Sequence, residues 1–385
     1  MTYLGLTQLQ LSLLYGDTNL YAIKLMKQTV SHMSIINESI RRLNISALPS
    51  DSHPNNAVKL LERRGIPQKA CAEIEKFVDA AIFLMQEDLL LTKKERLDPA
   101  EWKLDFILID SAKFDAFTSS PSMGNYQIYM SIGTVIMLLS FACELATPVG
   151  GDVKKATGVK NLLQRFLRFC FGRNNCLYDW TYLNDFGNEK NPAAVTLAKD
   201  AALLLFHHEL AHVLFGHHGV HDPVSDVRRA LEADADFNAG TMFAARLIRE
   251  KVGLKQIEKR LTDASLLIGI LFKAISAKTD LYHLPTIRSV TYLTGGAFIL
   301  ERFFQLPVSH LESVHYWEGE RSKHEAVFVK HLRGKSLEKF IGTEAKIAND
   351  MKALQNITLP LRDKYKDNFL CSVVHAMKAQ SQAGE

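Results

Sequence analysis

A short motif in the middle of the chain, His208-Glu209-x-x-His212, combines the residue types and spacing of a zinc site. Histidines four residues apart leave the same face of an α-helix one turn apart, so both imidazoles could bind one metal ion. Glu209 is rotated by about 100° from His208 around the helix. Its carboxylate could therefore reach a water on the metal without binding the metal itself. The motif predicts a metal site with Glu209 as general base.

A zinc ion held by two histidines of one helix needs a third protein ligand, and a catalytic site leaves the fourth position to water. Glu232 could be that ligand, because the segment after His212 is long enough for a turn, a loop and the start of a returning helix. Asp236, one helical turn further, could accept the free N–H of a zinc-bound imidazole. The competing interpretation of Glu232 is a surface ion pair with Arg228, four residues earlier. Asp234 is expected on the opposite side of this helix, in solvent.

His218 is a rival third ligand. It lies six residues after His212, where the metzincin pattern has its third histidine. That pattern also has glycine three residues after the second histidine, to let the chain turn, whereas this sequence has Phe215 there and Gly216 one place later. His217 is expected only at the end of the helix.

The two motifs at 208–212 and 232–236 together resemble the gluzincin pattern. The Glu-x-x-Ala-Asp form is similar to that of HtpX-type and CAAX-prenyl-type peptidases and their small soluble relatives, and Phe-His-His-Glu-Leu-Ala-His-Val resembles the Lit-type phage-exclusion peptidases. The resemblance is tight over 206–238 and loose over 114–290. It implies a zinc-dependent endopeptidase with Zn²⁺ as cofactor and a protein or peptide as substrate, in the Lit-type case a host protein cut upon phage infection.

The segment from Tyr282 to Arg288 resembles the His-Pro…Arg segment of the same peptidases, with the proline displaced by one position and the spacing from histidine to arginine one residue shorter. The resemblance implies that His283 stabilises the oxyanion of the tetrahedral intermediate. The alternative is a histidine at a helix start with no catalytic role.

The surrounding patterns predict a mainly α (α+β) fold. We expect a zincin-like catalytic core with a small mixed sheet, an active-site helix and a ligand-bearing helix, flanked by helical N- and C-terminal regions. The predicted division is a helical N-terminal region at 1–100, the metallopeptidase core at 101–300 and a helical C-terminal region at 301–385.

Apolar periodicity and turn residues place the individual elements. Strands are expected at Phe106–Ile109 and Tyr126–Met130, joined through 114–117 and a turn-rich 119–125; helices are expected at 19–43, 67–91, from about 134, 159–171, from 192, from 223 to about 250, 264–277 and 289–306. In the peptidases that the sequence resembles, an Ala-Phe segment such as Ala116-Phe117 precedes an edge strand that docks substrate. The alternative is an edge covered by the protein's own loops.

Composition limits the class of protein. With 385 residues and 47% hydrophobic residues, the chain can bury a sizeable core. A net charge of +4, with both signs spread throughout, carries no footprint of nucleic-acid binding. Five cysteines without a Cys-x-x-Cys pair, and an N-terminus without a signal pattern, predict the cytoplasm. The sequence does not predict the oligomeric state.

Two alternative functions depend on other segments of the chain. A catalytically silent, zinc-stabilised module could bind a partner through the basic insertion at 147–191, although a purely structural site has no use for Glu209. A membrane-associated HtpX-like protease would require the apolar stretch from Ile128 to Cys143 to insert. That stretch is short for a membrane span, so a core strand followed by a helix is expected there.

Overall fold

The computed structural model describes ten elements of this chain. They are α4 (Gln68–Arg96), β1 (Lys103–Ile109), β2 (Ala116–Ser122), β3 (Asn125–Ser131), α5 (Ile132–Ala146), α7 (Pro192–Leu214), the 3-10 turn η4 (His217–Gly219), α8 (Ser225–Arg249), α9 (Leu254–Ala274) and α10 (Pro285–Phe303). The residues described are 61–62, 65–96, 103–109, 114–122, 124–146, 192–220, 225–274 and 285–305, with 183, 186, 349, 353 and 356. This part of the chain is mainly helical with one small mixed sheet, which confirms the predicted fold class.

The sheet has the order β1-β3-β2. β1 runs parallel to β3, with Phe106 opposite Ile128, and β2 runs antiparallel to β3, with Phe117 opposite Tyr129. The predicted strands at 106–109 and 126–130 are confirmed within slightly longer elements.

The prediction that 119–125 forms a turn was wrong for most of that segment, because β2 extends to Ser122. Serine and proline are typical of turns, but an edge strand needs ladder bonds on one side only and tolerates Pro121 next to the irregularity between Ser119 and Ser122.

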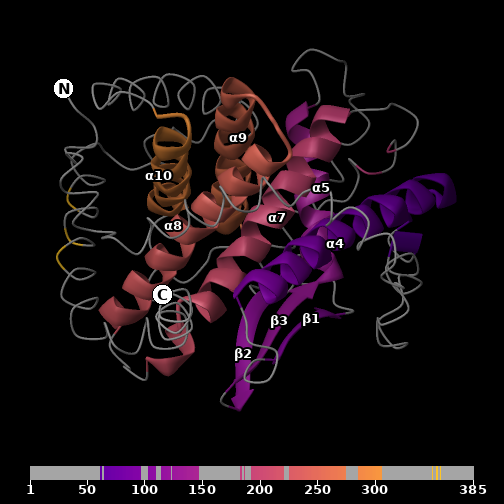
Figure 1. Ribbon diagram of the computed structural model, residues 1–385. Coiled ribbons are helices and arrows are strands. Elements are labelled where there is room, and N and C mark those ends of the chain that lie inside the picture. Colours follow the sequence, from indigo (N-terminus) through magenta and orange to yellow (C-terminus); the bar gives the residue numbers. More distant parts are fainter. Residues whose placement is uncertain are drawn as a thin grey trace.

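Helix α7 forms the centre of the helical part. Figure 1 shows it between the sheet and α4 on one side and α8, α9 and α10 on the other. Its apolar residues face all directions, and nearly every side chain from Ala198 to Leu214 is buried, as expected for a helix that is covered all round. It begins at Pro192, which suits the first helical position because proline lacks an N–H.

Gly216 ends this helix. Its φ of 69° lies in the left-handed region, which costs glycine little. The N–H of Gly216 donates to the carbonyl of Val213 at 3.1 Å, and the chain then turns into η4. This turn brings His217 back against His212.

Helices α8 and α10 cross with their backbones in contact. A Cβ at Gly240 would lie 1.9 Å from the carbonyl oxygen of Tyr292, and a Cβ at Gly295 would lie 1.9 Å from that of Phe237. Thr241 adds a hydrogen bond from its hydroxyl to the carbonyl of Gly295 at 2.9 Å. This close approach brings the start of α10 next to the Glu232-to-Asp236 turn of α8.

We expect Gly295→Ala to lower the free energy of unfolding by about 2 kcal/mol, because the added methyl meets backbone and forces the two helices apart. Gly253→Ala is the matched control: a Cβ at Gly253 meets nothing within 4 Å, and its cost should stay below about 1 kcal/mol. Urea denaturation of both variants measures the difference. Equal losses would contradict the close-packing explanation.

The helices expected at 67–91, from 134, from 192 and from 223 correspond to α4, α5, α7 and α8. α9 begins at Leu254, ten residues before the predicted start, and α10 begins at Pro285. The helices expected at 19–43 and 159–171 lie outside the described residues, as do nearly all of the basic insertion and nearly all of 301–385. α4 packs into the same hydrophobic core as α5, α7 and α9; the division of the whole chain at 100 and 300 stays a prediction.

The apolar stretch from Ile128 to Cys143 is shared between the end of β3 and helix α5, and most of its side chains are buried in the core. Across the described ranges, no helix combines the length and apolar character needed to cross a membrane.

Candidate metal centre

Three side chains predicted as ligands meet at one point. Nε2 of His208 lies 3.1 Å from Nε2 of His212, and the Glu232 carboxylate faces both nitrogens, with Oε2 3.3 Å from Nε2 of His208 and Oε1 3.6 Å from Nε2 of His212. Ligand atoms at about 2.0–2.2 Å from a tetrahedral zinc ion lie about 3.4 Å from one another. Two imidazoles and one carboxylate in this arrangement fit a zinc ion. Among the described residues, His208, His212 and Glu232 form the group of side chains close enough together to hold a metal.

His208 is held on its other side as well. Its Nδ1 lies 2.8 Å from Oδ1 of Asp236. Asp236 is fully buried, and Arg288 of α10 donates to both of its oxygens from Nε and Nη2, at 2.8 Å each. The carboxylate therefore lies where Nδ1–H of a ligand histidine would need an acceptor.

Arg288, to which the sequence assigned no role, is a main component of the site. Its guanidinium contacts the ring of Phe272 at 4.2 Å from the centroid and lies 3.6 Å from Glu232 Oε2. Nη2 is also within hydrogen-bonding distance of the His208 ring, 3.4 Å from Nδ1 and 3.3 Å from Nε2. A buried arginine next to two acidic residues would have been a recognisable signal only if the approach of α10 to α8 were known.

Contacts with histidine and arginine outweigh burial in setting the charges of Glu232, the candidate acidic ligand, and of Asp236. Burial alone would raise the pKa of Glu232, but the hydrogen bond from His208 and the charges of His212 and Arg288 lower it to about 2. Burial likewise opposes ionisation of Asp236, and the adjacent Arg288 and His208 hold its pKa well below the usual range. Both carboxylates are therefore ionised at neutral pH, the state that binds metal and accepts N–H bonds.

Glu209 is buried beside this cluster, with 6% of its surface exposed. Burial raises its pKa to about 7, and the charge of Glu232 adds to this increase, whereas His208 and Arg288 oppose it. A carboxyl group with a pKa near 7 can both accept and release a proton at neutral pH, which suits a general acid–base group.

His212 is supported by two residues that the sequence interpretation placed elsewhere. Its Nδ1 lies 2.8 Å from Nδ1 of His217, and Nε2 of His217 lies 3.1 Å from Oδ2 of Asp234. The prediction that Asp234 is in solvent was wrong: it is 7% exposed. Asp234 does leave a different side of α8 from Glu232, but η4 covers that side because the chain turns at Gly216.

The rival assignments lack such geometry. In the described part of the chain, His218 lies outside the ligand cluster, with its ring 5.8 Å from that of Tyr126. Arg228 is exposed, while Glu232 faces the two histidines. His283, expected to stabilise an oxyanion, lies outside the described residues.

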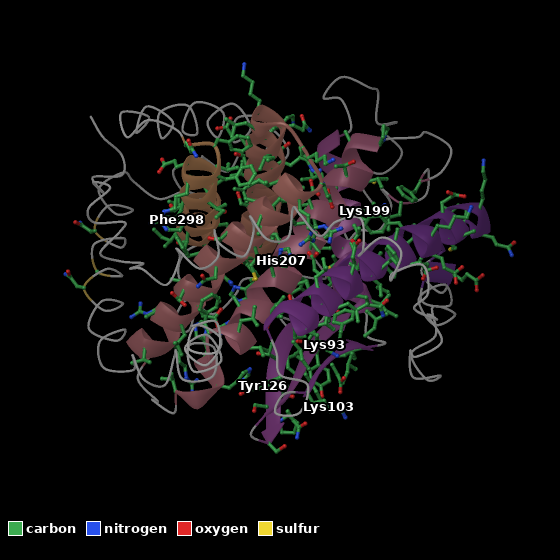
Figure 2. The ribbon with its side chains drawn as sticks, viewed as in Figure 1. Lys93, Lys103, Tyr126, Lys199, His207 and Phe298 are labelled. Carbon is green, nitrogen blue, oxygen red and sulfur yellow. The ribbon has the colours of Figure 1, made fainter. Side chains whose placement is uncertain are left out.

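His207, the residue before His208, is labelled near the middle of the molecule in Figure 2, where it contacts α4 from α7. Its Nε2 lies 2.7 Å from Oδ2 of Asp88 in α4. Oδ1 of the same carboxylate accepts from Arg246 and, at 2.6 Å, from Arg249 of α8. A carboxylate of the helical N-terminal region thus contacts His207, the residue before the candidate ligand His208.

Comparison of the chain with protein-family models, with curated proteins and with solved structures found no match.

Proposed function

We propose that this protein is a zinc-dependent endopeptidase that hydrolyses peptide bonds of a protein substrate. The observation that carries the proposal is the convergence of His208 Nε2, His212 Nε2 and the Glu232 carboxylate at separations of 3.1, 3.3 and 3.6 Å. These separations are close to those between ligand atoms of a tetrahedral zinc site, in which the fourth corner would be left for solvent. A buried glutamate adjacent to that point favours catalysis over a purely structural metal site.

Each residue would have a separate task. His208, His212 and Glu232 would hold the ion, and Asp236, itself anchored by Arg288, would orient the first imidazole. A bound zinc ion would polarise the scissile carbonyl and lower the pKa of its water. Glu209 would take the proton of the attacking water and later pass it to the leaving amine.

The edge strand β2 would bind the substrate. Among the described strands it pairs with β3 alone, and it packs against α7, the helix that carries the two histidines. An extended peptide could add to this edge through main-chain hydrogen bonds. Within this proposal the chain would have a zincin-like core, and its resemblance to Lit-type peptidases favours a cytoplasmic regulatory or phage-defence protease that cuts one host protein.

Metal analysis tests the first requirement. The purified protein should contain about one zinc ion per chain, and dialysis against a chelator should remove both the zinc and any proteolysis. His212→Ala should lose the metal, because loss of a ligand costs more than the roughly tenfold to hundredfold in affinity expected for loss of an outer partner. The control is His218→Ala, which should keep its zinc.

Absence of zinc from both the wild-type protein and the His218→Ala control would reject this function. Loss of zinc from the His218 variant, with zinc retained by the His212 variant, would assign the site to the rival histidine.

A further inference from the structure

Four side chains form a continuous line from α8 to the metal centre. Nδ2 of Asn238 donates to Oδ2 of Asp234 at 3.1 Å, and the same oxygen lies 3.1 Å from Nε2 of His217. Nδ1 of His217 then lies 2.8 Å from Nδ1 of His212. Asn238, Asp234 and His217 are all buried, with 4%, 7% and 5% of their surfaces exposed.

The chemistry of these groups assigns the protons along the line. An ionised carboxylate can only accept, so Nε2 of His217 must carry a proton and donate it to Asp234. In a neutral imidazole the other nitrogen is then bare, and Nδ1 of His217 can only accept. For a neutral His217, the facing Nδ1 of His212 is therefore the protonated one, which leaves Nε2 of His212 with its lone pair directed at His208 and Glu232.

The opposite assignment fails at Asp234. If Nδ1 of His217 donated to His212, its Nε2 would be bare and would face a carboxylate oxygen without a proton between them. His212 would then carry its proton on Nε2, the atom required for metal binding. Two adjacent acceptors in a buried site are costly, so the carboxylate excludes this state.

We propose that His217 and Asp234 are a positioning pair for the ligand His212: Asp234 sets the tautomer of His217, and His217 sets the tautomer and ring orientation of His212. The inference rests on the proposed metal site. It gives each ligand histidine its own support from α8, directly from Asp236 for His208 and through His217 from Asp234 for His212. Three carboxylates at alternate positions of one helix thus have three different roles.

The test compares three variants in the full chain, with circular dichroism to select folded protein. His217→Phe keeps a ring but removes both nitrogens. His217→Gln restores an acceptor and a donor about as far apart as the two ring nitrogens. His218→Phe, one residue along the same turn, is the matched control. The readouts are the affinity for Co²⁺, its visible absorption spectrum, and the ¹⁵N chemical shifts of the His212 ring in metal-free protein.

We expect His217→Phe to weaken Co²⁺ binding by about tenfold to a hundredfold and to alter the spectrum, whereas the Gln and His218 variants remain close to wild type. The metal-free wild type should show His212 protonated on Nδ1, and His217→Phe should shift that proton toward Nε2.

Co²⁺ affinity and ¹⁵N shifts unchanged in His217→Phe would overturn the positioning role and leave the metal site intact. A wild-type protein that binds no metal would instead remove the proposed function. The ¹⁵N shifts still test the pair in that case, and a proton on Nε2 of His212 would overturn it.

Discussion

Glu209→Gln should reduce peptide hydrolysis by about a hundredfold to ten-thousandfold, the range expected for loss of a general acid–base group, while zinc content stays at the wild-type level. The amide has nearly the shape of the carboxylate but cannot accept the proton of the attacking water. Glu209 is also not one of the three clustered ligands. A screen of cleaved proteins in cell extract, comparing wild type with Glu209→Gln at equal zinc content, measures the loss.

The matched comparison is His212→Ala, which should lose activity and metal together. Activity retained by the Gln variant would reject the proposed mechanism even if zinc is bound. Zinc lost from the Gln variant would mean that Glu209 contributes to holding the ion, and the assignment of roles within the site would have to change.

Asp88→Ala should lower the free energy of unfolding by about 3 kcal/mol, the lower end of the cost of removing one partner from a buried ion pair. The substitution leaves His207 Nε2 and Arg249 without this carboxylate in the interior. Arg246 keeps Glu87 and Glu250, at 2.6 and 2.8 Å, which limits the loss. The cations around Asp88 and its bond with His207 already hold its pKa well below the usual range despite burial, so the group is a carboxylate at neutral pH.

Asp105→Ala provides the control for Asp88. Asp105 forms ion pairs with Lys93 and Lys103 at 3.9 and 3.6 Å, but its side chain is 40% exposed. Exposed pairs of this kind contribute less than about 1 kcal/mol. Urea denaturation should separate the two variants clearly. If both lose the same free energy, the network around Asp88 has no special part in holding α4 against α7 and α8.

The sequence was sufficient wherever the geometry of a single helix decides which side chains share a face. His208 and His212 are one turn apart on α7, and Glu232 and Asp236 are one turn apart on α8. Each pair needs only helical periodicity to be aligned, so the three candidate ligands and the partner of one imidazole could be named from spacing. The strands expected at 106–109 and 126–130 were similarly evident from apolar residues of high β propensity, and β1 and β3 contain them within slightly longer elements.

Tertiary structure decided the contacts that depend on where elements end and how closely they approach. His217 supports His212 because the left-handed turn at Gly216 reverses the chain, and Asp234 is buried because η4 then covers its side of α8. Arg288 reaches Asp236 because glycines let α10 approach α8. Asp88 reaches His207 across a separation of 119 residues. Periodicity describes one element at a time, whereas these partners result from packing between elements, which no local pattern encodes.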